Sequence, residues 1–269
     1  MTPGSYEPPV LVVVGVDVTG AEVARLVLGH GEDPTVMLAV RGWGVRLTQD
    51  VRSHMAQEVR SRVAGKHVLT MSFVVEARAG APLELGVQTR RDQGLVIPEG
   101  EVPELCQRVA AYALVTSSRG VLMTQFSDRT NAVGQWGLPG GGLEAGEAPD
   151  RAALREAWEE SGQVIEVSEL ALIGSSHWIG RAPTGRLEDF HAVRVVYRAV
   201  CPEPTEPVVH DVGGTTLSAA WVQPADLHRL EVTPSWRSLL GVVMAPDEAD
   251  GTKHHEQDSD ADDRARPLP

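Results

Sequence analysis

The stretch from Gly141 to Gly162 reads GGLEAGEAPDRAALREAWEESG, and it contains the start and end signals of one helix. Pro149 suits the first helical position, where its missing N–H costs nothing, and Gly162 suits the residue just past the helix end. Ala148 stands at the N-cap position, where Ser or Thr would accept a hydrogen bond from the first turn. The stretch therefore predicts a helix that begins at Pro149, lacks a side-chain cap and ends before Gly162.

The end of this predicted helix carries three crowded carboxylates, Glu156, Glu159 and Glu160. Helical residues three or four positions apart are neighbours, so each like-charge pair costs roughly 0.2–0.5 kcal/mol, and the helix dipole disfavours each carboxylate by about 0.3–1 kcal/mol. Arg155 offsets part of this cost through its i,i+4 relation to Glu159, but one arginine does not neutralise three carboxylates. A hard cation such as Mg²⁺ does, because it binds one or two protein carboxylates together with phosphate oxygens.

An acidic run on a helix is more often a solvated face than a metal site, and this alternative applies to the bare string REAWEE. The context favours a ligand site. The glycine turn Pro139–Gly142 precedes the helix, and its backbone can approach a ligand more closely than side chains would allow. The apolar side of the helix is predicted to face the core, and it comprises Ala153, Leu154, Ala157 and Trp158.

The spacing of these residues resembles the signature of the Nudix hydrolases. That signature is Gly, five residues, Glu, seven residues, Arg-Glu, an apolar residue, any residue, Glu-Glu, any residue and Gly. The chain has the matching residues at that spacing: Gly141, Glu147, Arg155, Glu156, Ala157, Glu159, Glu160 and Gly162. The resemblance includes the lead-in Trp136–Gly142 and covers a segment from about Arg108 to Val243. Gln163 departs from the pattern, since the family usually has an apolar residue there; Val164 and Ile165 follow and could fill the core instead.

The resemblance implies a hydrolase that uses Mg²⁺ or Mn²⁺ to cleave a nucleoside diphosphate linked to another group. Glu156, Glu159 and Glu160 match the metal-binding positions, and one of them or a nearby loop glutamate commonly deprotonates the attacking water. Gly141 matches a position whose backbone carbonyl often joins the metal shell, and Arg155 matches the arginine that orients the glutamates. The expected catalytic residues are therefore the three glutamates and Arg155, and the expected metal ligands are the three glutamates and Gly141.

Composition sets limits on location and partners. The chain has 269 residues, 42% of them hydrophobic, and a net charge of −13, which argues against binding of duplex nucleic acid or anionic membranes. Met1–Pro9 lacks the basic region of a signal peptide and Val10–Val16 is too short to span a bilayer, so a cytoplasmic location is expected. Cys106 and Cys201 lack metal-ligand spacing and are expected to be reduced thiols. The expected partner is a small nucleotide substrate, and a homodimer is kept as an alternative to a monomer.

Three parts are predicted along the chain. They are a small α/β domain of unknown role at residues 1–100, a Nudix hydrolase domain at 104–245 and a disordered acidic tail at 246–269. The tail has almost no large apolar side chain, so burial cannot offset the entropy cost of ordering it. The polar stretch Arg90–Pro103 is the predicted linker.

Hydrophobic periodicity predicts the elements of both domains. In the first, they are strands at Val10–Val16, Thr35–Val40 and Val68–Val75, helices at Ala21–Leu28 and Thr48–Val63, and a further strand at Leu83–Gln88. In the second, they are strands at Val109–Ser117, Val121–Phe126, Val167–Ser175, His191–Val200 and Leu217–Val222, with closing helices at Pro224–Leu230 and Pro234–Val243. Strands with helices on both sides fit the α/β/α sandwich with a mixed sheet that the resemblance implies.

Outside the signature, individual residues give weaker predictions. Ser176–Leu187 reads as a loop that could contact a base or a phosphate, although an ordinary surface loop is the better interpretation. Trp178 could stack on a base or be partly buried. His191 is better interpreted as structural than as a substrate contact, and Asp211 could add an outer carboxylate.

Two other functions are considered as alternatives to the hydrolase. A nucleotide-sensing binding module of the same fold usually lacks signature glutamates, whereas all three are present here; the unexplained N-terminal part is what favours it. An isomerase of prenyl diphosphates would need a cysteine in the cleft, and Cys106 lies before the first strand of the predicted domain. A substrate panel with Mg²⁺ and Mn²⁺ would separate the hydrolase from the sensor.

Overall fold

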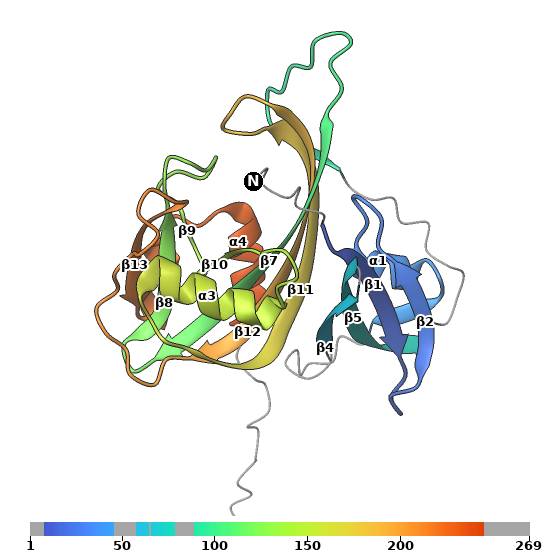
Figure 1. Cartoon of the computed structure of the whole chain (residues 1–269), viewed down its shortest axis with the longest axis horizontal. Helices are drawn as coiled ribbons and strands as arrows, with labels where there is room; N and C mark the ends of the chain where they lie inside the picture. The colour runs from blue at the N-terminus through green and yellow to red at the C-terminus, as the bar shows by residue number, and fades with distance from the viewer. Residues whose placement is uncertain (1–7, 46–57, 65, 79–88, 245–269) are drawn as a thin grey trace, which may run out of the picture.

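The computed structural model describes residues 8–45, 58–64, 66–78 and 89–244, which form two β-sheets with a few helices (Figure 1). The two sheets share no strand: residues up to 77 build the first, and residues from 90 onward build the second. The predicted strand Leu83–Gln88, residues 48–57 of the predicted helix Thr48–Val63, and the predicted tail at 246–269 lie outside the described residues.

The N-terminal sheet has five strands in the order β2-β1-β5-β3, with β4 also paired to β5. Strands β1 and β5 are parallel, and the other pairs are antiparallel. Its elements are β1 (Val10–Val16), β2 (Glu22–Val27), α1 (Pro34–Ala39), β3 (Trp43–Val45), β4 (Glu58–Ala64) and β5 (Lys66–Ala77). The strands predicted at Val10–Val16 and Val68–Val75 are thereby confirmed.

The helix predicted at Ala21–Leu28 is wrong, because Glu22–Val27 form strand β2. The strand runs antiparallel to β1, from Val27 opposite Val12 to Glu22 opposite Val16. A short run of apolar residues fits a helix or a strand equally well by periodicity, and here pairing with the neighbouring strand decides.

The strand predicted at Thr35–Val40 is also wrong, because these residues lie in helix α1 or at its end. The side chain of Asp33 accepts hydrogen bonds from the N–H groups of Thr35 (2.8 Å) and Val36 (3.1 Å), and Pro34 occupies the first helical position. An N-cap acid followed by proline is a helix-start signal that outweighs the β-branched residues after it.

Residues 58–63 of the predicted helix Thr48–Val63 form part of β4. Val59 lies opposite Met71 and Ser61 opposite Leu69, in an antiparallel pair with β5. The i,i+4 stripe of apolar residues is therefore not helical over these positions, since Val59 and Val63 also satisfy the two-residue period of a strand.

The second sheet has eight strands in the order β13-β8-β7-β12-β11-β6, with β10 paired to β7 and β9 to β8. The β7–β12 and β11–β6 pairs are parallel, and the other pairs are antiparallel, so the sheet is mixed. Its strands are β6 (Arg90–Arg91), β7 (Glu104–Ser117), β8 (Gly120–Phe126), β9 (Trp136–Gly137), β10 (Gly140–Gly142), β11 (Glu166–Arg181), β12 (Leu187–Val200) and β13 (Thr216–Val222). Its helices are α3 (Pro149–Ser161), the 3-10 helix η1 (Pro224–Arg229) and α4 (Pro234–Val243).

Helices cover both faces of the second sheet, as the predicted α/β/α sandwich requires (Figure 1). Buried alanines of α3, including Ala153, pack in one core cluster, and Trp236 of α4 packs in another. Strand β12 contributes to both clusters, because Val195 belongs to the first and Val196 to the second. Alternate residues of a strand face opposite sides of a sheet, so the two helices lie on opposite faces.

The loop predicted at Ser176–Leu187 is wrong over most of its length. Strands β11 and β12 pair as far as Arg181 opposite Leu187, so the connection between them is residues 182–186 alone. Trp178 therefore lies within a strand, and its ring stacks on Phe190 with the ring centroids 4.6 Å apart. This aromatic contact between paired strands stabilises the extension beyond the predicted strand end.

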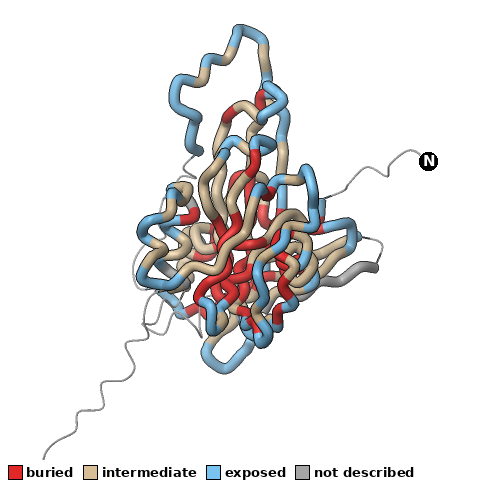
Figure 2. Tube along the Cα trace, turned by 90° about the vertical axis from the view of Figure 1, so that its left-hand side faces the viewer, coloured by how far each residue is buried: buried red, intermediate tan, exposed pale blue. Residues whose placement is uncertain are grey.

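The two sheets contact each other through a shared core. The first core cluster includes Leu38 and Phe73 of the N-terminal part together with residues of the second sheet. Figure 2 shows that buried residues gather in the body of the molecule, whereas the segment that projects from it is mostly exposed. Within the described part of the chain, no helix has the length and apolar character needed to cross a bilayer.

Candidate active site

Helix α3 begins and ends as the sequence predicts. Pro149 is its first residue, and Ala148 provides no side-chain cap. Gly162 adopts φ of 67°, and its N–H donates to the carbonyl of Trp158 at 2.8 Å. Glycine takes this left-handed conformation without a steric penalty, so it closes the helix directly after the carboxylates.

The predicted apolar face of α3 is confirmed for Ala153 and Ala157, which are fully buried, but not for Trp158. The Trp158 side chain is 50% exposed. Its ring stacks on the ring of His210, with the centroids 4.4 Å apart and the planes 12° from parallel. A loop, and not the core, therefore lies against this side of the helix.

The loop at residues 208–211 satisfies the last carbonyls of α3. The N–H of Val208 donates to the carbonyl of Ser161 at 2.9 Å. The N–H groups of His210 and Asp211 donate to the carbonyl of Glu159 at 2.7 and 3.0 Å. Carbonyls at a helix end have no partner inside the helix, so this loop caps α3 and places His210 and Asp211 beside the carboxylates.

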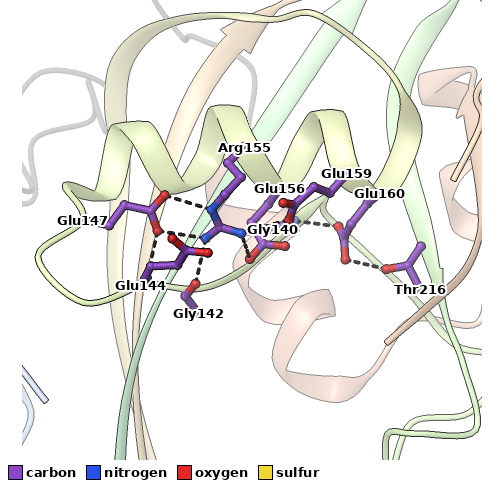
Figure 3. Close-up of polar contacts among 9 residues, drawn as sticks. All are labelled: Gly140, Gly142, Glu144, Glu147, Arg155, Glu156, Glu159, Glu160 and Thr216. Carbon is purple, nitrogen blue, oxygen red and sulfur yellow. Dashed lines mark hydrogen bonds and ion pairs between the residues drawn. The ribbon is translucent and has the colours of Figure 1, made fainter. Parts of the chain in front are cut away.

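Arg155 lies at the centre of the carboxylate cluster (Figure 3). Its Nε and Nη2 atoms donate to the two oxygens of Glu147 at 2.9 and 2.8 Å. Its Nη1 atom donates to one oxygen each of Glu156 and Glu159, both at 2.9 Å, and Nη2 also donates to the carbonyl of Gly142 at 3.0 Å. The planar guanidinium thus fixes the orientation of three carboxylates at once.

Two carboxylates bound to Arg155 have pKa values shifted in opposite directions. Burial opposes the charge of Glu147, but hydrogen bonds from Arg155 and from the N–H of Glu144 outweigh it and lower its pKa. Glu156 is more deeply buried, and this desolvation raises its pKa despite Arg155, with repulsion from Glu159 adding to the rise. One guanidinium is therefore not enough to stabilise the charge of Glu156.

Glu160 lies behind this pair and is only 5% exposed. The N–H of Gly140 donates to its Oε2 atom at 2.8 Å, and the hydroxyl of Thr216 donates to its Oε1 atom (Figure 3). Burial, with repulsion from Glu156 and Asp211, raises the pKa of Glu160 to about 8. Near neutral pH a buried acid of this kind is largely protonated unless a cation joins it.

A pocket of about 560 Å³ opens beside these carboxylates. Its lining contains both signs of charge, an exposed aromatic pair and glycine backbone. The lining residues are Arg108, Arg129, Gly141, Arg155, Glu156, Trp158, Glu159, His210, Asp211, Gly214 and Thr215.

Arg108 and Arg129 differ from Arg155 in having no carboxylate within ion-pair distance among the described residues. Arg108 lies on β7, and a Cβ on Gly142 would come within 2.6 Å of its Nε atom. These two guanidinium groups are free to bind an anion, and arginine binds phosphate in a bidentate manner.

The structure brings together the predicted site residues on α3 and in the glycine turn. Glu156, Glu159, Arg155 and Gly141 line the pocket, and Glu160 lies behind it. A Cβ on Gly141 would collide with the carboxylate of Glu156, so only glycine allows this approach.

Sequence reasoning missed several residues of the pocket. These are Arg108, Arg129, His210, Gly214 and Thr215 at its lining and Thr216 behind it. They come from separate strands and loops, and no local spacing marks them. Asp211, for which the sequence suggests only an outer carboxylate as an alternative, lines the pocket. Cys106, which an isomerase would need, lies on β7 and is not among the described residues that line the pocket.

Gln163, the departure from the signature, is 2% exposed and fully hydrogen-bonded. Its Nε2 atom donates to the carbonyl of Ser161 and to Thr205, and its Oε1 atom accepts from the N–H of Thr205 at 3.0 Å and from Cys201. Ile165 is buried in the core, whereas Val164 is 75% exposed. The amide thus replaces an apolar residue without leaving a buried polar atom unpaired.

The donor atoms of the pocket fit a hard divalent cation. Glu156, Glu159 and Gly141 line the pocket, and Glu160 provides a third carboxylate behind them. Mg²⁺ and Mn²⁺ prefer such oxygen ligands. A cation would also favour the ionised forms of Glu156 and Glu160, whose pKa values burial raises.

Comparison with known proteins points to one family. Residues 107–240 match the NUDIX domain. Two relatives named nucleoside triphosphatase NudI, from Escherichia coli O139:H28 and from Shigella flexneri, are each 28% identical to the chain over 138 residues. The match covers 50% of this chain and 94% of each relative.

Solved structures of the same family are also similar to the chain. A MutT NUDIX hydrolase from Burkholderia pseudomallei is 28% identical with a TM-score of 0.40, covering 51% of this chain and 98% of that one. The NUDIX domain of Shewanella oneidensis NrtR, solved with ADP ribose, is 21% identical with a TM-score of 0.38, covering 53% and 88%. The family assignment rests on the sequence match.

Proposed function

The chain belongs to the Nudix hydrolases, and we propose that it uses Mg²⁺ or Mn²⁺ to hydrolyse the pyrophosphate linkage of a nucleoside diphosphate bearing another group. The observation that carries this proposal is the convergence of Glu156, Glu159 and Glu160 from one helix beside a pocket that also holds Arg108 and Arg129. Such a pocket has groups for a cation and for phosphate oxygens at the same place.

The cation and its ligands address the charge of the substrate. Several negative charges on a pyrophosphate repel an attacking nucleophile. Glu156, Glu159 and the backbone of Gly141 would hold the cation, with Glu160 as the third carboxylate. When bound, the cation neutralises phosphate charge and lowers the pKa of water.

The side chains of the pocket need little rearrangement to bind the cation and the substrate. Arg155 already holds Glu156 and Glu159 in fixed orientations through hydrogen bonds of 2.9 Å. Arg108 and Arg129 bind phosphate oxygens of the substrate. A carboxylate of the cluster accepts the proton of the attacking water.

The relatives and the pocket wall support a substrate class to test first. Because the two relatives are named nucleoside triphosphatases, nucleoside triphosphates are the first class to test. The flat pair of Trp158 and His210 lines the pocket and offers an aromatic surface on which a base can stack.

The test is a panel of nucleoside triphosphates, nucleotide sugars and dinucleotides with Mg²⁺, with Mn²⁺ and with EDTA, with products identified by mass. We expect metal-dependent cleavage of a phosphoanhydride, and its loss in Glu156→Gln. Glu166→Gln makes the same chemical change at an exposed position of β11 and should keep full activity. Cleavage in EDTA, or unchanged activity of Glu156→Gln, would contradict the proposal.

A nucleotide sensor is the second candidate, favoured by the N-terminal sheet that packs on the NUDIX domain. The same panel separates the two, because a sensor binds a nucleotide without forming product. We also propose a cytoplasmic location and a division into two domains, placed before β6 and not at residues 100–104, because Arg90–Arg91 pair with β11 of the second sheet.

A further inference from the structure

A second cluster of metal-binding side chains lies at the contact between the two sheets, away from the α3 pocket. His30 follows β2 in the N-terminal part, His177 lies in β11 and Asp189 lies in β12. Each offers one ligand atom, and these atoms lie within 4.8 Å of one another. Asp189 pairs opposite Ile179, so its side chain projects from the same face of the sheet as that of His177.

Both imidazoles direct a nitrogen at the same carboxylate oxygen. The Nε2 atom of His30 lies 2.8 Å from Oδ1 of Asp189, and Nε2 of His177 lies 2.5 Å from it. Zinc–ligand bonds of about 2.0–2.2 Å in a tetrahedron separate the ligand atoms by about 3.3 Å. If each imidazole nitrogen moved roughly 0.5–0.8 Å away from Oδ1 of Asp189, an ion would fit between these three ligand atoms.

The ring of His177 is held in place from two further sides. Its Nδ1 atom lies 2.9 Å from the hydroxyl oxygen of Thr89. The backbone of Gly31 lies so close that a Cβ there would be 2.8 Å from Cε1 and Nδ1 of the ring. Metal-bound imidazoles usually donate their second N–H to a nearby acceptor, and the Thr89 hydroxyl meets this requirement.

A third imidazole, His191, is fully buried next to the cluster, with its ring centroid 5.6 Å from that of His30. The hydroxyl of Ser175 donates its one proton to the carbonyl of Glu32 at 3.0 Å, so it accepts from Nε2 of His191 at 3.0 Å. The Nδ1 atom of His191 then carries a lone pair, and it has no hydrogen-bond partner in the described part of the chain. A third imidazole ring is therefore packed against the two that face Asp189.

Solvent can reach the three ligand side chains. Those of His30, His177 and Asp189 are 22%, 12% and 20% exposed. They are buried enough to be held in place, and the remaining exposure leaves a route for an ion.

We propose that His30, His177 and Asp189 form a binding site for one divalent transition-metal ion of the Zn²⁺ class. Two imidazole nitrogens and one carboxylate oxygen suit Zn²⁺, Co²⁺ and Ni²⁺, whereas Mg²⁺ prefers oxygen ligands alone. Water completes the coordination. Because His30 belongs to the N-terminal part and the other two ligands to the NUDIX domain, the ion links the two parts of the chain.

The test is a calorimetric titration of the full chain with Zn²⁺ in excess Mg²⁺, which occupies oxygen-only sites. His254→Ala and His255→Ala are included in every variant, because neighbouring histidines outside the described residues could bind Zn²⁺ themselves. We expect one Zn²⁺ per chain, and a weakening of at least tenfold in His177→Ala. His228→Ala removes an exposed histidine of η1 and serves as the control that keeps full binding.

A second variant separates an ion site from a metal-free hydrogen-bonded cluster. His30→Gln keeps a side-chain N–H that can donate to Asp189 but lacks the imidazole ligand. We expect this variant to melt at the metal-free temperature of the parent chain, with no rise on adding Zn²⁺, whereas Zn²⁺ raises the melting temperature of the parent. No Zn²⁺ uptake by the parent, or equal uptake by His30→Gln, would overturn the proposal.

Discussion

The α3 pocket and the cluster of His30, His177 and Asp189 gather ionisable groups in two different ways. The pocket has several carboxylates from one helix and its preceding turn, bound by the single guanidinium of Arg155. The histidine cluster has one carboxylate that accepts from two imidazoles, one of them 159 positions away in the chain. Oxygen donors suit Mg²⁺ and Mn²⁺, and nitrogen donors suit Zn²⁺, so the two places should select different ions.

The two clusters also differ in how the folded chain shifts the pKa values of their carboxylates. In the pocket, burial raises the pKa values of Glu156 and Glu160. The positive charge of the folded chain is therefore insufficient to stabilise both carboxylates, and a cation bound with the substrate supplies what is missing. At the histidine cluster, hydrogen bonds from His30 and His177 outweigh burial and keep the pKa of Asp189 low. We therefore expect changes to the cation-binding carboxylates to affect turnover most, and changes near the histidines to affect Zn²⁺ binding and the pH dependence of stability.

The largest expected effect is that of Glu160→Gln on turnover. The pKa of about 8 means that the metal-free protein already holds a largely neutral acid at this position, so the amide should cost little folding stability. The amide cannot provide the negative charge that a cation needs, and we expect kcat to fall by about 10²–10⁴-fold. Steady-state kinetics with Mg²⁺, alongside Glu166→Gln, measures this effect; wild-type turnover would remove Glu160 from the site.

Arg155→Ala should lower the free energy of unfolding by about 3 kcal/mol, because it leaves buried carboxylates without their partner. The side chains of Arg155 and Glu147 are only 23% and 14% exposed, so solvent cannot replace the lost hydrogen bonds. Arg151→Ala is the matched control on the same helix, since Arg151 is 75% exposed, and it should change stability by less than about 0.5 kcal/mol. Urea unfolding compares the two variants. Equal losses would mean that Arg155 does not hold the cluster together.

The pH dependence of stability tests the surroundings of the histidine cluster. Burial lowers the pKa of His191 to about 4, and repulsion from His30 and His177 adds to the shift, which Asp33 opposes. The unfolded state binds the proton near pH 6.5 and the folded state only near 4, so stability is complete above pH 6.5 and falls as the pH drops through that window.

Between pH 7 and 5 in EDTA, His191 should account for a loss of about 2 kcal/mol. His191→Gln lacks this titration, so the difference in urea stability between wild type and variant should shrink by that amount at pH 5. A difference that is independent of pH would show that His191 takes up a proton as easily when folded as when unfolded.

The smallest expected effect is that of Arg129→Ala on substrate binding. Arg129 lines the pocket and has no carboxylate partner among the described residues, so its loss should raise KM about tenfold and leave kcat nearly unchanged. A matching fall in kcat would instead assign Arg129 to the transition state. Arg119→Ala, an exposed arginine paired to Glu206, is the control and should leave both constants unchanged.

The sequence predicted which side chains of α3 lie together because these residues are close together in the chain. Helix ends marked by Pro149 and Gly162 fix which side chains share a face, so Glu156, Glu159 and Arg155 could be placed together from spacing alone. Arg129 could not be placed, because it lies in a loop whose position depends on the whole sheet.

The N-terminal part was harder to predict because its signals are short and conflict with one another. Thr35–Val40 has the β-branched residues of a strand, but Asp33 and Pro34 start a helix there. Ala21–Leu28 has no such boundary signal, and pairing with β1 decides its conformation. The histidine cluster depends on how this part packs against β11, so local spacing could not reveal it.

A titration of Mn²⁺, followed by the electron paramagnetic resonance signal of the free ion, tests directly whether the α3 carboxylates bind a cation together with phosphate. It compares wild type with Glu156→Gln, in the presence and absence of a non-hydrolysable nucleoside triphosphate analogue. The α3 carboxylates should take up Mn²⁺ far more tightly when the analogue is present, and Glu156→Gln should lose this increase. Uptake that does not depend on the nucleotide, or that persists in the variant, would contradict the assignment of this pocket as the place where metal and phosphate meet.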